Sequence, residues 1–180
     1  MFNRQTWTIL LVATLFAVAG GWLQHRSRLA HVPAGVHMTA IGEVAPDLAL
    51  MGTDGRQHRL SEYRGKRVLL NFWASWCGPC LDEMPALAQA ARQHANTSVV
   101  VGIAMDEPAR ALAFLTVHPV DYPILLGELA SPSTSLRFGD TAQVLPYSAL
   151  LDADGRLLAT HRGPLDAATL ARWLGGGPAD

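Results

Sequence analysis

The chain has 180 residues, of which 49% are hydrophobic and 16% are charged, and this suits one globular domain with an additional apolar segment. The formal net charge is −1, from 14 basic and 15 acidic residues, so the basic face that a nucleic-acid-binding protein needs is not expected. There are only two cysteines, whereas a secreted domain held together by disulfides would carry more.

Residues 1–24 are predicted to be an N-terminal targeting segment. Residues 7–23 are apolar apart from two threonines and two glycines, and about 17 residues is the lower limit for a membrane-spanning helix. The small residues 17–20 also fit a signal-peptidase site. A retained anchor and a cleaved signal therefore both remain open, beside a segment that is neither. Arg26 and Arg28 alone would favour a cytoplasmic domain, but the bias is one or two charges, and we expect delivery to the extracytoplasmic side.

The following residues are predicted to divide into a tether, a domain and a tail. Residues 25–40 lack apolar periodicity and contain Pro33 and Gly35, which is typical of a flexible tether. The hydrophobic patterning then predicts a folded domain over residues 41–175. Three glycines and a proline close the sequence, so residues 176–180 are expected to be a disordered tail.

The domain alternates strand and helix patterns, which predicts an α/β fold. Residues 68–73 and 99–104 are near-continuous apolar runs, typical of strands buried on both faces. A helix predicted between them implies a parallel pair with a right-handed crossover. The other predicted elements are a hairpin of strands 48–51 and 57–60 around Asp54-Gly55, a short turn or helix at 61–65, a kink at Pro85 in the central helix, a helix at 108–118, a strand at 122–126, a short helix capped by Ser131 and ending near Phe138, a second hairpin of strands 147–151 and 156–161, and a helix at 166–174.

The two cysteines lie in the run Trp76-Cys77-Gly78-Pro79-Cys80, between a predicted buried strand and a predicted helix. This context is typical of a redox-active pair. Because the N-terminus of a helix stabilises an anion, we expect a thiolate at Cys77, with a pKa below the ordinary value of about 8.5. Cys80 shares the helical face of Cys77, so it can resolve a mixed disulfide. Pro79 suits the first helical turn, and Gly78 lets a substrate approach closely.

The alternatives for the cysteine pair are half of a zinc site and two inert buried thiols. Zinc would need two further ligands, and the sequence has neither a second cysteine pair nor a His-x₃₋₅-His run. His25, His31 and His37 are irregularly spaced within the predicted tether. We therefore expect no metal and no cofactor.

Ordered motifs over residues 41–174 carry a family resemblance. They are Ala45-Pro46-Asp47, the run LSEYRGK at 60–66, the run LNFWASWCGPC at 70–80, Glu83-Met84-Pro85 and Leu145-Pro146. Together they resemble the TlpA/ResA group, DsbE-related disulfide reductases that are anchored in the membrane and belong to the thioredoxin family.

This resemblance implies a thioredoxin-like fold, a central mixed sheet flanked by helices, with an added N-terminal β-hairpin. It implies reduction of disulfides in partner proteins, for example during cytochrome c maturation, with electrons from a membrane thiol-transporting reductant. It also implies a location on the periplasmic side, anchored in the inner membrane by the N-terminal segment.

The resemblance also assigns expected roles around the cysteines. Pro146 matches a cis-proline that faces the pair, keeps metals away from the thiols and holds the Leu145 backbone open to an extended substrate strand; a plain proline at a strand start is the alternative. Glu83 matches an acid that would carry the proton of Cys80; the alternative is a solvated glutamate in the first helical turn. Asn71 stands where ordinary thioredoxins have a buried acid, and an amide cannot titrate. Trp76 is expected to line the site.

The resemblance leads to a protein-disulfide reductase as the expected function. Gly-Pro between the cysteines is typical of reducing members, although an oxidase or isomerase remains an alternative. A thiol peroxidase of the peroxiredoxin type is a second alternative, since such proteins share the Ala-Pro-Asp start, but their Pro-x-x-x-Thr-x-x-Cys pattern is absent. A copper-binding thiol chaperone is the third, although such sites usually space their cysteines more widely.

Overall fold

The chain divides into two units, residues 1–32 and residues 33–180. The computed structural model describes residue 10, residues 12–21 and residues 35–179. In the first unit residue 10 and residues 12–21 are helical and expose their apolar side chains. Across all the described residues, no helix combines the length and the hydropathy that crossing a membrane requires. The rest of the predicted targeting segment, and the tether up to residue 34, lie outside the described residues.

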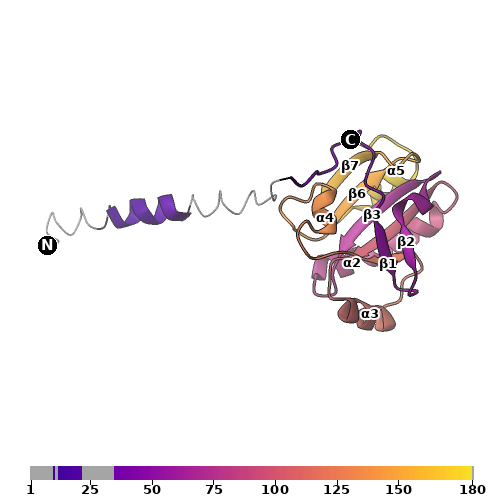
Figure 1. Cartoon of the computed structure of the whole chain (residues 1–180), viewed down its shortest axis with the longest axis horizontal. Coiled ribbons are helices and arrows are strands. Elements are labelled where there is room, and N and C mark those ends of the chain that lie inside the picture. Colours follow the sequence, from indigo (N-terminus) through magenta and orange to yellow (C-terminus); the bar gives the residue numbers. More distant parts are fainter. Residues whose placement is uncertain (1–9, 11, 22–34, 180) are drawn as a thin grey trace. The chain divides into compact units, whose positions relative to one another are not determined.

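The second unit is built on one mixed sheet (Figure 1). Among the described residues, its strands follow the order β2-β1-β5-β4-β3-β6-β7. Strands β3, β4 and β5 are parallel to one another, while β6 and β1 run antiparallel to their neighbours β3 and β5. The elements are β1 (Ala49–Gly52), β2 (Gln57–Arg59), the 3-10 helix η1 (Leu60–Tyr63), β3 (Arg67–Trp73), α2 (Gly78–Gln93), β4 (Ser98–Ala104), α3 (Pro108–Val117), β5 (Ile124–Leu126), α4 (Thr134–Arg137), β6 (Tyr147–Leu151), β7 (Leu157–Arg162) and α5 (Ala167–Leu174).

Strand β3 is the centre of the domain because both of its faces are covered. Successive side chains of a strand point to opposite faces, so Leu69 and Trp73 join one apolar core with Leu87 of α2 and residues of α5. Phe72 and its alternate neighbours join the second core, which includes Phe138 after α4. Residues 68–73 of β3 are each at most 3% exposed, as the continuous apolar run predicted.

The structure differs from the sequence prediction at three boundaries. Thr39, expected in the tether, is buried, and both its N–H and its hydroxyl donate to the carbonyl of Arg137. Helix α4 is capped by the side chain of Ser133, which accepts from the N–H of Leu136; the predicted cap at Ser131 is therefore wrong by two residues. In the expected disordered tail, the carbonyl of Gly177 accepts a hydrogen bond of 2.8 Å from Arg67, so order extends beyond α5. Pro85, where the sequence predicted a kink, lies inside α2, and the helix continues through it to Gln93.

Candidate active site

One edge of the sheet gathers the residues on which the sequence analysis focused. Strands β3, β4 and β5 are parallel, so the segments that follow them all leave the sheet at the same edge. Strand β6 runs the opposite way, so the Leu145-Pro146 segment enters the sheet at this edge too. The cysteine run after β3 therefore lies beside the residues after β4 and before β6.

Cys77 and Cys80 form a disulfide at the start of α2. Cys77 is the N-cap of this helix, and its Sγ accepts a hydrogen bond of 3.3 Å from the backbone N–H of Cys80. Cys77 is 5% exposed, whereas Cys80 is fully buried. A thiolate at Cys77 would therefore be held by an N–H group and the positive end of the helix dipole, and Cys77 is the more accessible sulfur of the two.

Glu83 lies one turn further along α2 and is buried, with 5% exposure. One carboxylate oxygen accepts from the Asn71 side-chain amide at 2.6 Å, and the other accepts from the N–H of Leu165 at 2.9 Å. Burial raises the pKa of Glu83, although the bonds from Leu165 and Asn71 and the charge of His161 act the other way. The alternative of a solvated first-turn glutamate is therefore wrong, because the loop before α5 covers this face of α2.

Asn71 connects this carboxyl group to the sheet. Its amide donates to Glu83 and also to the hydroxyl of Ser148, on the neighbouring strand β6, at 3.2 Å. Because Asn71 and Leu69 point to the same face of β3, the amide faces α2. The amide thus occupies the buried position behind the disulfide, with the titratable group supplied from the helix.

Asp106, which the sequence analysis did not identify, fixes the loop that precedes the cysteines. It follows β4 and is 4% exposed. Its carboxylate accepts from the N–H of Ser75 at 2.9 Å, from the Ser75 hydroxyl at 2.5 Å and from the N–H of Glu107 at 2.8 Å. Ser75 stands two residues before Cys77, so this acid ties the redox loop to the end of the adjacent strand. An acid two residues after a predicted buried strand was the available signal.

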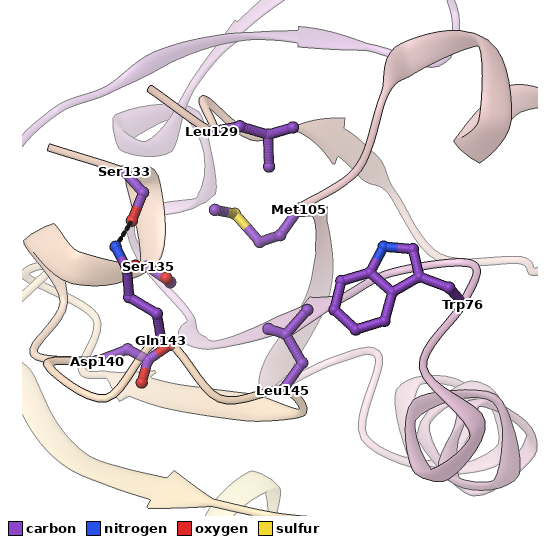
Figure 2. Close-up of a pocket in the computed structure, with 8 residues that line it drawn as sticks. All are labelled: Trp76, Met105, Leu129, Ser133, Ser135, Asp140, Gln143 and Leu145. Atoms are coloured by element: carbon purple, nitrogen blue, oxygen red, sulfur yellow. Dashed lines mark hydrogen bonds between the residues drawn. The ribbon is translucent and has the colours of Figure 1, made fainter. Parts of the chain in front are cut away.

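A pocket of about 150 Å³ is lined by Trp76, the residue before Cys77, and by Leu145, the residue before Pro146 (Figure 2). Trp76, which is 67% exposed, lies on one side, and Leu145 lies between it and a polar wall. The Leu145–Pro146 peptide bond is cis, as the resemblance implied. The lining residues are Trp76, Met105, Leu129, Ser133, Ser135, Asp140, Gln143 and Leu145.

The structure thus places every predicted site residue at or behind one edge of the sheet. Trp76 and Leu145 lie at the surface pocket, while Glu83 and Asn71 lie behind the pair in the core. Among the described residues, no group of three or more histidines, cysteines or acids is placed to hold a metal ion.

The comparison with known proteins decides the family. The redoxin family model matches residues 40–172. The chain belongs to the redoxin family. This redoxin is 31% identical over 137 residues to the thiol-disulfide oxidoreductase ResA of Geobacillus kaustophilus, and the match covers 75% of the chain and 76% of ResA.

Solved structures agree with this assignment. A Chlorobium tepidum protein described as a thiol:disulfide interchange protein DsbE shares 32% identity with the redoxin, at a TM-score of 0.64, over 72% of this chain and 90% of that one. The exposed lipoprotein thioredoxin of Streptococcus pneumoniae shares 31% identity, at a TM-score of 0.61, over 73% and 99% of the two chains. The predicted thioredoxin-like fold is confirmed, and the redoxin is a thiol-disulfide oxidoreductase with a close cysteine pair.

Proposed function

We propose that this redoxin reduces disulfide bonds in partner proteins on the extracytoplasmic side of a membrane, for example in apocytochromes awaiting haem. The observation that carries the proposal is the position of the cysteines, with Cys77 as the N-cap of α2 and Cys80 fully buried behind it. This arrangement favours attack by one sulfur and resolution by the other.

The reaction takes place in two exchanges. The Cys77 thiolate attacks one sulfur of the partner disulfide, forms a mixed disulfide with it and releases the other sulfur as a thiolate. The Cys80 thiolate then attacks Cys77, which forms the Cys77–Cys80 disulfide and releases the second partner thiolate. Two electrons pass from the redoxin to the partner, and the two released thiolates take up two protons.

Glu83 is proposed to accept the proton of Cys80 as the second exchange begins. It lies three residues after Cys80, on the same helical face, and burial raises its pKa towards neutrality, which suits proton transfer. Asn71 is proposed to orient this carboxyl group through its hydrogen bond of 2.6 Å. Pro146 and Leu145 are proposed to receive the partner as an extended strand.

The oxidised pair must be reset by an external dithiol. A membrane thiol-transporting reductant is the proposed donor, with residues 1–24 as the anchor, or as a signal that delivers the domain. The exposed lipoprotein thioredoxin supports an extracytoplasmic location. Mass spectrometry of the protein from membrane and soluble fractions tests this: an intact N-terminus in the membrane fraction means an anchor, and cleavage near residue 19 means a signal.

The reduction potential of the Cys77–Cys80 pair tests the direction of the reaction. The full-length protein in detergent is equilibrated with defined ratios of reduced and oxidised dithiothreitol and glutathione. A potential near −270 mV, about that of thioredoxin, is expected for a reductant, whereas a value near −120 mV, about that of a strong oxidase, would overturn the proposed direction. The exchange chemistry itself would stand in either case.

A further inference from the structure

The pocket at Trp76 and Leu145 has two chemically different walls (Figure 2). One wall is apolar and is formed by the side chains of Trp76, Met105 and Leu145. Opposite them lie Asp140 and the hydroxyl groups of two serines. A side chain that enters the pocket thus passes an apolar surface before it reaches polar groups.

Asp140 is fully buried, yet only one of its carboxylate oxygens has a hydrogen-bond partner among the described residues. Oδ1 accepts from the N–H of Val144 at 3.3 Å, while Oδ2 is buried and unpaired. Burial raises the pKa of Asp140, while the N–H of Val144, the nearby Ser135 hydroxyl and the positive charge of Arg162 lower it. The Ser135 hydroxyl makes no hydrogen bond to Oδ2 in the structure. The bond to Val144 explains one oxygen as a support of the loop. The Oδ2 oxygen has no such structural role, and leaving a buried acceptor unpaired costs free energy.

The loop that carries Asp140 is held in place by its own hydrogen bonds. The backbone N–H of Asp140 donates to the carbonyl of Ser135 at 3.2 Å, and the carbonyl of Asp140 accepts from Gln143 at 3.1 Å. The Tyr147 hydroxyl donates to the carbonyl of Phe138 at 2.9 Å. Asp140, which lines the pocket, is therefore held in a fixed position by the loop.

We propose that this pocket binds a basic side chain, lysine or arginine, that lies near the disulfide cysteine of the partner protein. Its apolar stem would pass Trp76 and Leu145, as the stems of lysine and arginine do on apolar surfaces. Its charged end would donate to Asp140 Oδ2 and to the hydroxyl of Ser135, since an ammonium group has three donors. Trp76 precedes Cys77 and Leu145 precedes Pro146, so the pocket lies close to the site of exchange. When the disulfide of a partner is at Cys77, the partner residues next to its own cysteine should therefore lie at the mouth of this pocket. The inference rests on the proposed reductase function and adds the selection of its substrates.

Peptide disulfides that differ at one residue test the proposal. Each peptide carries a fluorophore and is joined through its only cysteine to a quencher, so reduction releases fluorescence. A lysine stands one, two or three residues before or after the cysteine, and matched peptides carry norleucine or glutamate there. The full-length protein is assayed with dithiothreitol as the recycling reductant.

At one position or more, kcat/KM of the wild type should be about 10- to 100-fold higher for lysine than for norleucine, the range expected for a hydrogen bond to a charged group. Glutamate should be the poorest of the three. In Asp140→Asn the amide oxygen can still accept from Val144, so the loop is kept while the charge is lost. This variant should lose the preference for lysine, so that its ratio of kcat/KM for the lysine peptide to that for the norleucine peptide falls to about one.

Asp154→Asn is the matched control. It removes the same charge from the exposed turn between β6 and β7. Strand β6 begins at the site and ends at this turn, so the change lies at the other end of the strands. The control should keep the preference for lysine. Equal rates of the wild type on lysine and norleucine peptides at all positions, or a preference retained in Asp140→Asn, would overturn the proposal and leave the reductase function intact. If the wild type reduces none of the peptides, the reductase function fails and this inference fails with it.

Discussion

Removal of the Asp106 carboxylate should weaken both the fold and the redox loop. Asp106→Ala removes the acceptor of three hydrogen bonds, two from Ser75 and one from the N–H of Glu107. The Ser75 hydroxyl can rotate towards water, but the two backbone donors lose their partner, at about 1–3 kcal/mol each. The sum is about 2–6 kcal/mol. Relief of a buried charge and entry of water reduce it, so we expect a loss of about 2–4 kcal/mol in the free energy of unfolding.

Urea unfolding of the oxidised protein measures this loss, and it corresponds to a fall in Tm of roughly 4–16 °C for a domain of this size. Two milder variants grade the effect. Ser75→Ala removes only the hydroxyl bond and should cost about 1 kcal/mol, while Asp106→Asn keeps one acceptor oxygen and should lie between the other two. A loss below about 1 kcal/mol in Asp106→Ala, or the reverse order of the three variants, would refute the assignment of Asp106 as the support of the loop.

Three further predictions concern the cysteines and two titrating side chains. Cys80→Ser should accumulate a mixed disulfide with a partner peptide, visible by mass spectrometry, whereas Cys77→Ser should form none; equal trapping by both would contradict the order of attack. Burial raises the pKa of Glu83 above its ordinary 4.5. The wild type should therefore lose stability relative to Glu83→Gln as pH rises from about 4.5 through the raised pKa. A constant difference between the two free energies of unfolding, measured in urea from pH 4 to 8, would contradict this. Hydrogen bonds to Asp54 and Glu62 raise the pKa of His58 above 6.5. The extra stability of the wild type over His58→Gln should therefore be complete below pH 6.5 and vanish as pH rises through the raised pKa. Thermal unfolding across this range checks the prediction, and a stability difference that grows with pH would contradict the ion pairs.

Patterns with a local physical cause could be read from the sequence. The apolar run of β3 predicted a strand covered on both faces, and Asp54-Gly55 predicted the first hairpin. The position of Cys77 at the N-terminus of a helix followed from its place between a predicted buried strand and a predicted helix. Glu83 was placed on the face of Cys80 by its spacing alone, but its burial depends on Leu165, 82 positions later in the chain.

Features that depend on tertiary pairing could not be predicted in this way. Strand β1 pairs antiparallel with β5, and neither strand carries a local signal for that partner. Asp106 and Asp140 are acids in loops, and acids in loops are usually solvated. Only the parallel order of β3 and β4 brings Asp106 to Ser75, and only the return of the chain into β6 brings Asp140 to the mouth of the site.

The strands at the two edges of the sheet bear on solubility. Strand β2 is an edge strand of only three residues, Gln57–Arg59, and its His58 side chain is engaged by acids on both sides. At the other edge, β7 ends in His161 and Arg162. A very short edge strand such as β2, and charged side chains on an edge strand, discourage pairing with a further strand. If the protein accepts extended chains at Leu145, as proposed, its edge strands offer copies of itself few places to add strands and aggregate.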